Sequence, residues 1–192
     1  MIKKFDDLIY IKENALDKEF CEHCVKKFKE DDRKEQGITG GGLRLDIKRS
    51  LDLNISSASG WKGEDKIFYN SLNEALHEYI DQHKEYMPIL QNTFDDSGYQ
   101  LQETKPGEFY NWHSDYGVEV NGTSRILTYL WYLNDVTYEG ETEFFTGKKI
   151  KPETGKIIIF PATWMYFHQG RSPKKEIKYI CTGWLYQDVQ FT

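Results

Sequence analysis

The amino-acid sequence predicts an α+β protein in which a β-sandwich or barrel is backed by helices. Helical periodicity is confined to the first half of the 192-residue chain, whereas short strand patterns alternate with turn residues from about residue 98 onward. Aromatic residues make up 15% of the chain, and aromatic side chains fit the pleated surface of a sheet. Helices followed by a run of short strands are typical of this fold class.

The length of the chain is that of one ordinary domain, so we expect residues 1–192 to form a single domain. Within it, residues 1–97 are expected to supply mostly helical support. Residues 98–192 are expected to form the β-rich core.

In the first half, a short strand is predicted at residues 8–12, followed by a helix over 17–31. Asp17 has the character of an N-cap, and Phe20, Cys24 and Phe28 follow it at helical spacing. A further strand is predicted from the alternation within residues 48–55.

The clearest helix is predicted over residues 64–86, and Pro88 should end it. Its apolar stripe consists of Phe68, Leu72, Ala75, Leu76, Tyr79, Ile80 and His83. His77 and His83 are six residues apart, which does not suit a helical metal pair. We expect both to be surface or boundary histidines, like His23.

Four glycines fall within residues 36–42. No Gly-Lys-Ser/Thr follows, so this segment is not a phosphate-binding loop. It is predicted to be a flexible turn, and a mobile loop near an active site is the sharper alternative.

The second half contains seven strand patterns separated by turn residues, among them the hairpin signal Asn121-Gly122. The predicted strands are 99–104, 108–115, 125–133, 142–146, 156–160, 164–168 and 176–186.

The net charge and the cysteine content limit the expected partners and the expected cellular compartment of the chain. The net charge is −6, which argues against nucleic acid as the main partner. Three cysteines, an odd number, and a first segment without a long apolar run point to a reducing, cytoplasmic location. No stretch is apolar enough for a membrane span, and the cysteines are expected to be ordinary buried or half-buried thiols.

The most informative pattern is His113-Ser114-Asp115, followed far downstream by His168 and then by Lys178. His113 and Asp115 are two residues apart, so on an extended chain they point to the same side. Two imidazoles and one carboxylate suit ferrous iron and leave coordination positions open. We expect Lys178, on the neighbouring strand of a hairpin, to reach the distal end of a metal-bound ligand. Each piece alone has an ordinary structural explanation, but the ordered set favours a metal site.

Residues 99–186 resemble the 2-oxoglutarate- and Fe(II)-dependent oxygenases, in particular the prolyl 4-hydroxylase branch in its small bacterial or viral form. The segment 106–115 resembles the first metal-ligand strand of that family, and 125–136 resembles its central strand and turn. Gly140-Glu141-Thr142-Glu143-Phe144 resembles its Gly-Glu-Thr-x-Phe element. His168 and the Lys178–Trp184 stretch follow in the family's order.

The resemblance implies a distorted double-stranded β-helix, or jelly-roll, and a site that hydroxylates an unactivated C–H bond while 2-oxoglutarate and O2 become succinate and CO2. His113, Asp115 and His168 would bind Fe(II), and Lys178 would pair with the distal carboxylate of 2-oxoglutarate. Thr104 and Thr128 are further candidates for contacting this co-substrate, and ascorbate is an additional expected cofactor.

Tyr110, Arg125 and Trp184 match the substrate side of the iron in prolyl hydroxylases, which implies a proline-containing peptide or protein as the substrate. Ordinary barrel packing is the alternative role for Tyr110 and Trp184. The family usually has a tyrosine nine residues before the first metal histidine, where this chain has Thr104. Either a water or another tyrosine takes that place, or the co-substrate sits differently.

Three other functions stay open at this point. The same chemistry could act on a free amino acid, a small metabolite or a nucleobase, although nucleobase-repair relatives typically use arginine where this chain has Lys178. The chain could instead be a non-catalytic jelly-roll binding module. A zinc hydrolase is a weaker alternative, because no general base stands out nearby.

Overall fold

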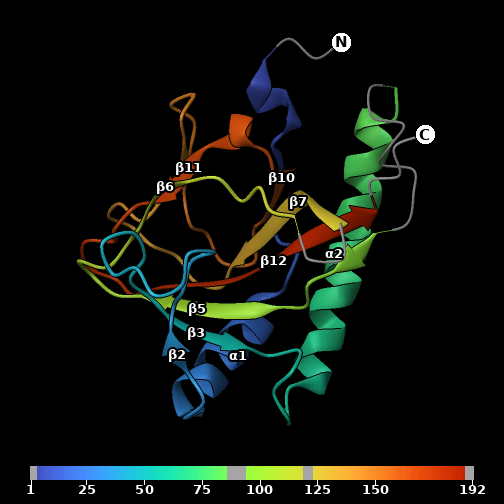
Figure 1. The fold of residues 1–192 in the computed structure, drawn as a ribbon. Coiled ribbons are helices and arrows are strands. Elements are labelled where there is room, and N and C mark those ends of the chain that lie inside the picture. The colour runs from blue at the N-terminus through green and yellow to red at the C-terminus, as the bar shows by residue number, and fades with distance from the viewer. Residues whose placement is uncertain (1–3, 86–93, 119–122, 189–192) are drawn as a thin grey trace.

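The computed structural model describes residues 4–85, 94–118 and 123–188, which form two antiparallel sheets and two α-helices (Figure 1). The large sheet has the strand order β1-β10-β7-β12-β5-β3-β2, with β4 paired to β12, and the small sheet has the order β6-β11-β8-β9. The strands of the large sheet are β1 (Tyr10–Lys12), β2 (Glu35–Gln36), β3 (Leu51–Asn54), β4 (Asp95–Asp96), β5 (Gln100–Thr104), β7 (Thr123–Tyr132), β10 (Ile157–Pro161) and β12 (Lys178–Asp188). Those of the small sheet are β6 (Tyr110–His113), β8 (Thr142–Phe144), β9 (Lys149–Ile150) and β11 (His168–Gly170). The predicted α+β jelly-roll is confirmed.

The two helices lie close to their predicted positions. Helix α1 spans Lys18–Glu30, and the Asp17 carboxylate caps it by accepting a hydrogen bond from the Phe20 amide at 2.7 Å. Helix α2 spans Lys62–His83, so it begins and ends slightly earlier than expected; Pro88 lies outside the described residues. The predicted apolar stripe of α2 is buried except for Ile80, which is half-buried.

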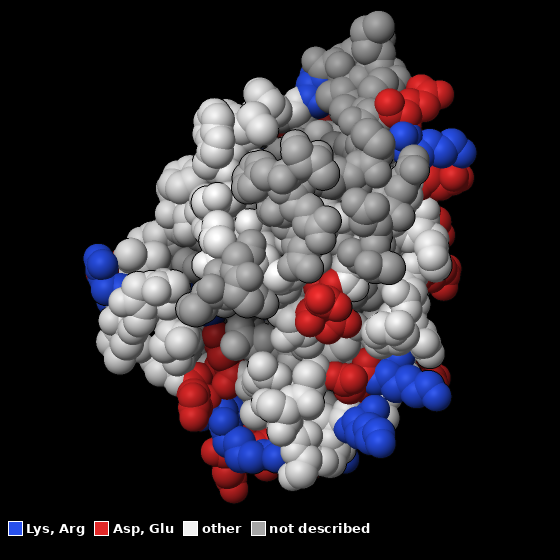
Figure 2. Space-filling view, turned by 45° about the vertical axis from the view of Figure 1, so that its right-hand side comes forward, with Lys and Arg blue, Asp and Glu red and all other residues white. Residues whose placement is uncertain are grey.

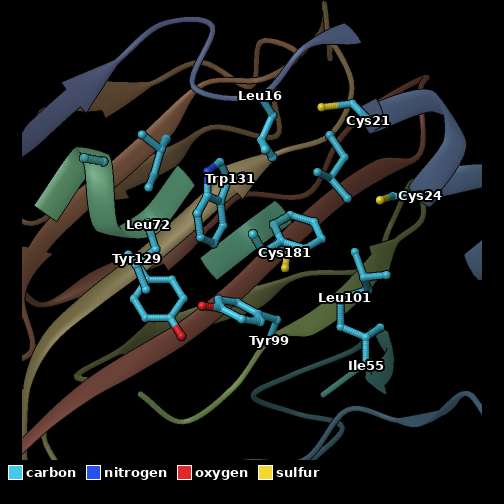
Figure 3. Close-up of a cluster of buried hydrophobic side chains, with 14 of the residues drawn as sticks. Leu16, Cys21, Cys24, Ile55, Leu72, Tyr99, Leu101, Tyr129, Trp131 and Cys181 are labelled. Atoms are coloured by element: carbon cyan, nitrogen blue, oxygen red, sulfur yellow. The ribbon is translucent and has the colours of Figure 1, made fainter. Parts of the chain in front are cut away.

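Both helices pack against one face of the large sheet. Tyr129 and Trp131 of β7 point into this helix-facing core, together with Tyr99 and Leu72 (Figure 3). The three cysteines are free and buried in this core, as predicted. Because β7 alternates, Leu130 and Tyr132 point to the opposite face, where they pack against side chains of the small sheet. Strand β7 is therefore buried on both faces, which explains its continuous apolar run.

The structure corrects two expectations for local structure. Residues 164–168 do not form one strand: Trp164–Tyr166 make the 3-10 turn η3, and β11 begins only at His168. His83 is buried rather than at the surface, and its ring nitrogens lie 2.7 Å from the Tyr79 carbonyl oxygen and 3.1 Å from that of Asp7. His23 is at the surface, as expected. The Asn121-Gly122 hairpin signal lies outside the described residues.

No helix in the described part of the chain is both long and apolar enough to span a membrane.

Candidate active site

Three side chains converge where the small sheet faces the large one. His113 ends β6, His168 begins β11, and the two histidines are direct partners in the antiparallel ladder. Asp115 follows β6 by two residues. One ligand atom from each of the three residues lies within 4.8 Å of the others, and they form the single group of this kind within the described residues. The predicted triad is therefore assembled.

The backbone fixes the orientation of both imidazoles. His113 Nδ1 lies 2.8 Å from the Asn111 carbonyl oxygen, and His168 Nδ1 lies 2.9 Å from that of Tyr166. A carbonyl only accepts, so each Nδ1 carries the proton and donates it. Each Nε2 is then left with its lone pair facing Asp115 and the space between the rings, as a metal ligand requires.

The Asp115 carboxylate bridges the two histidines. Its Oδ1 lies 3.5 Å from His113 Nε2 and its Oδ2 lies 3.6 Å from His168 Nε2. The Thr128 hydroxyl donates a hydrogen bond to Oδ2 at 2.8 Å. Burial raises the pKa of Asp115, but His168, His113 and Thr128 together outweigh it and hold the pKa well below its usual range. The group is thus an anionic ligand at neutral pH.

Burial and the neighbouring His113 lower the pKa of His168 to about 4, against the opposing effect of Asp115. A neutral imidazole is the form that binds a metal. Two imidazole nitrogens and one carboxylate on one side of a small space fit Fe(II), since this donor set leaves positions open for a co-substrate.

Lys178 is the buried cation of the site. It is 4% exposed, and its ammonium donates hydrogen bonds to the carbonyl oxygens of Gly140 at 3.0 Å and Arg171 at 3.4 Å. Burial lowers the pKa of Lys178 to about 8, with Glu141 opposing. A buried ammonium whose acceptors among the described residues are two carbonyl oxygens suits a carboxylate ligand, because pairing offsets the desolvation of both charges.

The expected placement of Lys178 on a hairpin with His168 is wrong. His168 belongs to the small sheet and Lys178 to the large one, so they face each other across the jelly-roll. Lys178 nevertheless reaches the small sheet: a Cβ atom placed on Gly170 would lie 3.4 Å from its Nζ. Because Lys178 lies on the large sheet, its long side chain spans the gap between the two sheets.

The two candidate threonines lie in different surroundings. Thr104 is the partner of Lys178 in the β5–β12 ladder, so their side chains share one face of the sheet. Thr128 binds Asp115 instead, which places it beside the triad. Thr104 is therefore next to the candidate anchor of the co-substrate, and Thr128 orients a candidate metal ligand.

Of the three candidate substrate residues, Tyr110 contacts the triad directly. The Tyr110 ring stacks on the His113 imidazole, with centroids 3.5 Å apart. Trp184 is opposite Thr128 in the β7–β12 ladder, and the Arg125 guanidinium lies 3.9 Å from the centroid of the Trp184 ring. The indole Nε1 of Trp184 is buried and has no hydrogen-bond partner among the described residues.

Two further groups at the site were not singled out from the sequence. Tyr132 lies in the core between the sheets, where its hydroxyl donates to Thr142 Oγ1 at 2.7 Å. The second group is a buried ion pair between Lys48 and Asp52, beside Tyr110. The signal for it was present: Lys48, Ser50 and Asp52 are polar residues at alternate positions, which on an extended chain share one face.

Comparison with known proteins gives the family of this site. Residues 99–186 match the family model described as the 2OG-Fe(II) oxygenase superfamily. This segment is therefore similar to the members of that superfamily. It contains all three residues of the triad and Lys178, so the resemblance noted from the sequence is confirmed. Fe(II) and 2-oxoglutarate, the groups in the superfamily's name, fit the triad and the buried lysine.

Among curated proteins, a probable prolyl 4-hydroxylase 3 of Arabidopsis thaliana is similar, with 28% identity over 178 residues and 79% of this chain covered. The chain spans 57% of the length of that relative.

Three solved structures share the fold over nearly the whole chain. The viral collagen prolyl hydroxylase of Paramecium bursaria Chlorella virus 1, in complex with 2-oxoglutarate, has a TM-score of 0.66 at 19% identity and covers 95% of this chain and 96% of its own. A Pseudomonas putida prolyl-4-hydroxylase has a TM-score of 0.67 at 16% identity, covering 95% and 97%. A Trichoplax adhaerens prolyl hydroxylase in complex with a hypoxia-inducible-factor peptide fragment has a TM-score of 0.72 at 16% identity, covering 93% and 83%.

Proposed function

We propose that this chain is an Fe(II)- and 2-oxoglutarate-dependent dioxygenase that hydroxylates a prolyl residue in a peptide or protein, and that it works as one domain in the cytoplasm. The observation that carries the reaction class is the arrangement of His113, Asp115 and His168 opposite the buried Lys178. Three buried cysteines without a disulfide are in keeping with a reducing compartment.

Each residue of the site has a defined task in this proposal. The two Nε2 atoms and the Asp115 carboxylate hold the iron, and the iron with 2-oxoglutarate and O2 supplies the oxidising chemistry. Lys178 fixes the far carboxylate of the co-substrate, with Thr104 beside it. The backbone carbonyls and Thr128 keep the ligands from turning, and the apolar core between the sheets excludes water.

The prolyl substrate is supported by the side chains around the triad and by the relatives. Tyr110, Trp184 and Arg125 offer two aromatic walls and a guanidinium. The named relatives are prolyl hydroxylases. A nucleic-acid substrate has less support: on the face shown in Figure 2, basic side chains lie scattered among acidic ones rather than gathered in one patch.

The test is succinate formation by the iron-loaded protein, with and without proline-containing peptides, together with the mass of the peptide afterwards. We expect the peptide to stimulate succinate formation and to gain one oxygen atom on proline. If succinate forms but no peptide stimulates its formation, the assay is repeated with free amino acids and nucleobases. Stimulation by one of these would reassign the substrate. Absence of succinate from folded, iron-loaded protein under all conditions would favour a non-catalytic binding module.

A further inference from the structure

Residues 47–54 form a strap that joins the two sheets beside the site. The Asn111 amide donates to the Ile47 carbonyl at 2.8 Å and the Arg49 amide donates to the Phe109 carbonyl at 2.8 Å, which adds this end of the strap to the edge of β6. The other end is β3, which pairs with β5 in the large sheet. The strap therefore crosses from one sheet to the other.

A buried ion pair holds the strap at this crossing. Lys48 Nζ lies 2.6 Å from Asp52 Oδ2, and the two side chains are only 5% and 7% exposed. The Ser50 hydroxyl donates to the other oxygen, Oδ1, at 2.8 Å. Gly37 covers the group, because a Cβ atom there would lie 2.9 Å from Asp52 Oδ2 and 2.3 Å from Ser50 Oγ. No larger residue fits without moving the pair.

The ion pair also touches the substrate side of the site. The Lys48 ammonium lies over the Tyr110 ring, 5.2 Å from its centroid, and Lys48 is the bridge partner of Tyr110. The same ring stacks on His113 with centroids 3.5 Å apart and an interplanar angle of 8°. A cation is attracted to the face of an aromatic ring, so the pair contributes to holding Tyr110 against the imidazole.

We propose that Lys48 and Asp52 are positioning residues that fix Tyr110 over His113 and thereby shape the wall on which the substrate rests. A buried ion pair is a poor source of stability, since apolar side chains of the same volume do as well. Its use here is geometric: Asp52 on the large sheet holds Lys48, and Lys48 holds Tyr110 on the small sheet. The expected effect on kinetics rests on the proposed function. The expected position of Tyr110 over His113 does not depend on which substrate is used.

The first test is structural and needs neither iron nor substrate. The ring stacked on His113 should shift the proton resonances of the His113 imidazole upfield in the apo protein, and Tyr110→Leu gives the baseline without this shift. Lys48→Met alone would leave a buried, unpaired carboxylate. The variant compared with the wild type therefore combines Lys48→Met with Asp52→Asn, because the new amide oxygen can still accept the hydrogen bond from Ser50. We expect the shift to move toward the Tyr110→Leu baseline. A full wild-type shift in the folded double variant would overturn the proposal.

The second test is kinetic and separates positioning from a general structural role. In the double variant we expect kcat/KM for a peptide substrate to fall about tenfold, as for loss of a desolvated cation–π contact, and succinate formed per hydroxylated product to rise. Affinity for 2-oxoglutarate should be unchanged. A matched control is Lys156→Met, because Lys156 is equally buried and its Nζ lies 2.6 Å from Glu153 Oε2, without an aromatic partner from the site. An equal loss of kcat/KM in Lys156→Met would overturn the proposal. If no peptide stimulates succinate formation by the wild-type protein, the result counts against the proposed function instead.

Discussion

The space between the two sheets has an apolar region and a polar one, and they differ in what completes them. In the apolar region, Leu130, Ile158 and Phe160 of the large sheet pack against Phe144 of the small sheet. In the polar region, Lys178 and two of the three triad residues are buried, with charges that the chain itself satisfies incompletely. Close packing stabilises the first region without a ligand. The second region is arranged for a metal and an anion, so changes in the two regions should have separable effects.

The largest effect is expected from removing a metal ligand. His113→Ala should lower Fe(II) affinity and turnover more than about a hundredfold, because loss of a mere hydrogen-bond partner of a ligand already costs about 10–100-fold. The apo protein should unfold at nearly the wild-type temperature, since a half-buried imidazole adds little to the apolar core. Calorimetry for iron binding and thermal unfolding measures both quantities. His77→Ala, at an exposed position of α2, is the control, and wild-type turnover in His113→Ala would remove this residue from the site.

The opposite pattern is expected in the apolar region. Ile158→Ala should lower the free energy of unfolding by about 2–5 kcal/mol, as do other truncations of buried aliphatic residues. Fe(II) affinity of the folded fraction should stay unchanged, because Ile158 lies in the apolar cluster and not in the triad. Urea unfolding and iron titration below the transition check the two parts. A large loss of iron affinity would show that the two regions are coupled.

A smaller effect is expected where the polar region is supported by one hydroxyl. Thr128→Val removes the 2.8 Å hydrogen bond to Asp115 and keeps the shape of the side chain. Iron affinity should fall about tenfold, at the lower end of the effect of such partners, with little change in 2-oxoglutarate affinity once iron is saturating. If the co-substrate affinity falls instead, Thr128 contacts 2-oxoglutarate, as expected from the resemblance.

The last effect is a pH dependence that belongs to the polar region alone. Burial places the pKa of Lys178 at about 8 rather than its ordinary 10.5. Its protonated form pairs with the distal carboxylate, so 2-oxoglutarate affinity should fall as pH rises above about 8, by at most about tenfold per pH unit. Lys178→Arg, which stays charged throughout, should flatten this profile. A wild-type profile that is already flat between pH 7 and 10 would argue that another group binds the carboxylate.

The regions also differ in how far the sequence predicts them. The helices and long strands follow from local periodicity: the stripe of α2 and the two-sided apolar run of β7 need no knowledge of distant partners. The short strands β2, β4 and β9 have two residues each and carry no pattern. The aromatic run before His168 suits a strand by composition, but its backbone turns in η3, where the Tyr166 carbonyl orients His168.

Within the site, residue identity was predictable and placement was not. His113, Asp115 and His168 could be chosen from their type and order, and the structure brings them together. That Lys178 faces His168 from the other sheet depends on strand pairings between residues far apart in the chain, which local patterns do not encode. The alternation of Lys48 and Asp52 is visible in the sequence, but the role of the ion pair is not, because this role depends on Tyr110 on another strand.

The most direct measurement is an anaerobic titration of the protein with Fe(II) and then with 2-oxoglutarate, followed by visible absorption. The weak charge-transfer band of an iron-chelated keto acid should develop with saturable binding in the wild type. It should be absent in His113→Ala and should need higher 2-oxoglutarate concentrations in Lys178→Met. Folded wild-type protein that binds Fe(II) at the triad but develops no band with 2-oxoglutarate would contradict the assignment of this site as a 2-oxoglutarate-dependent dioxygenase.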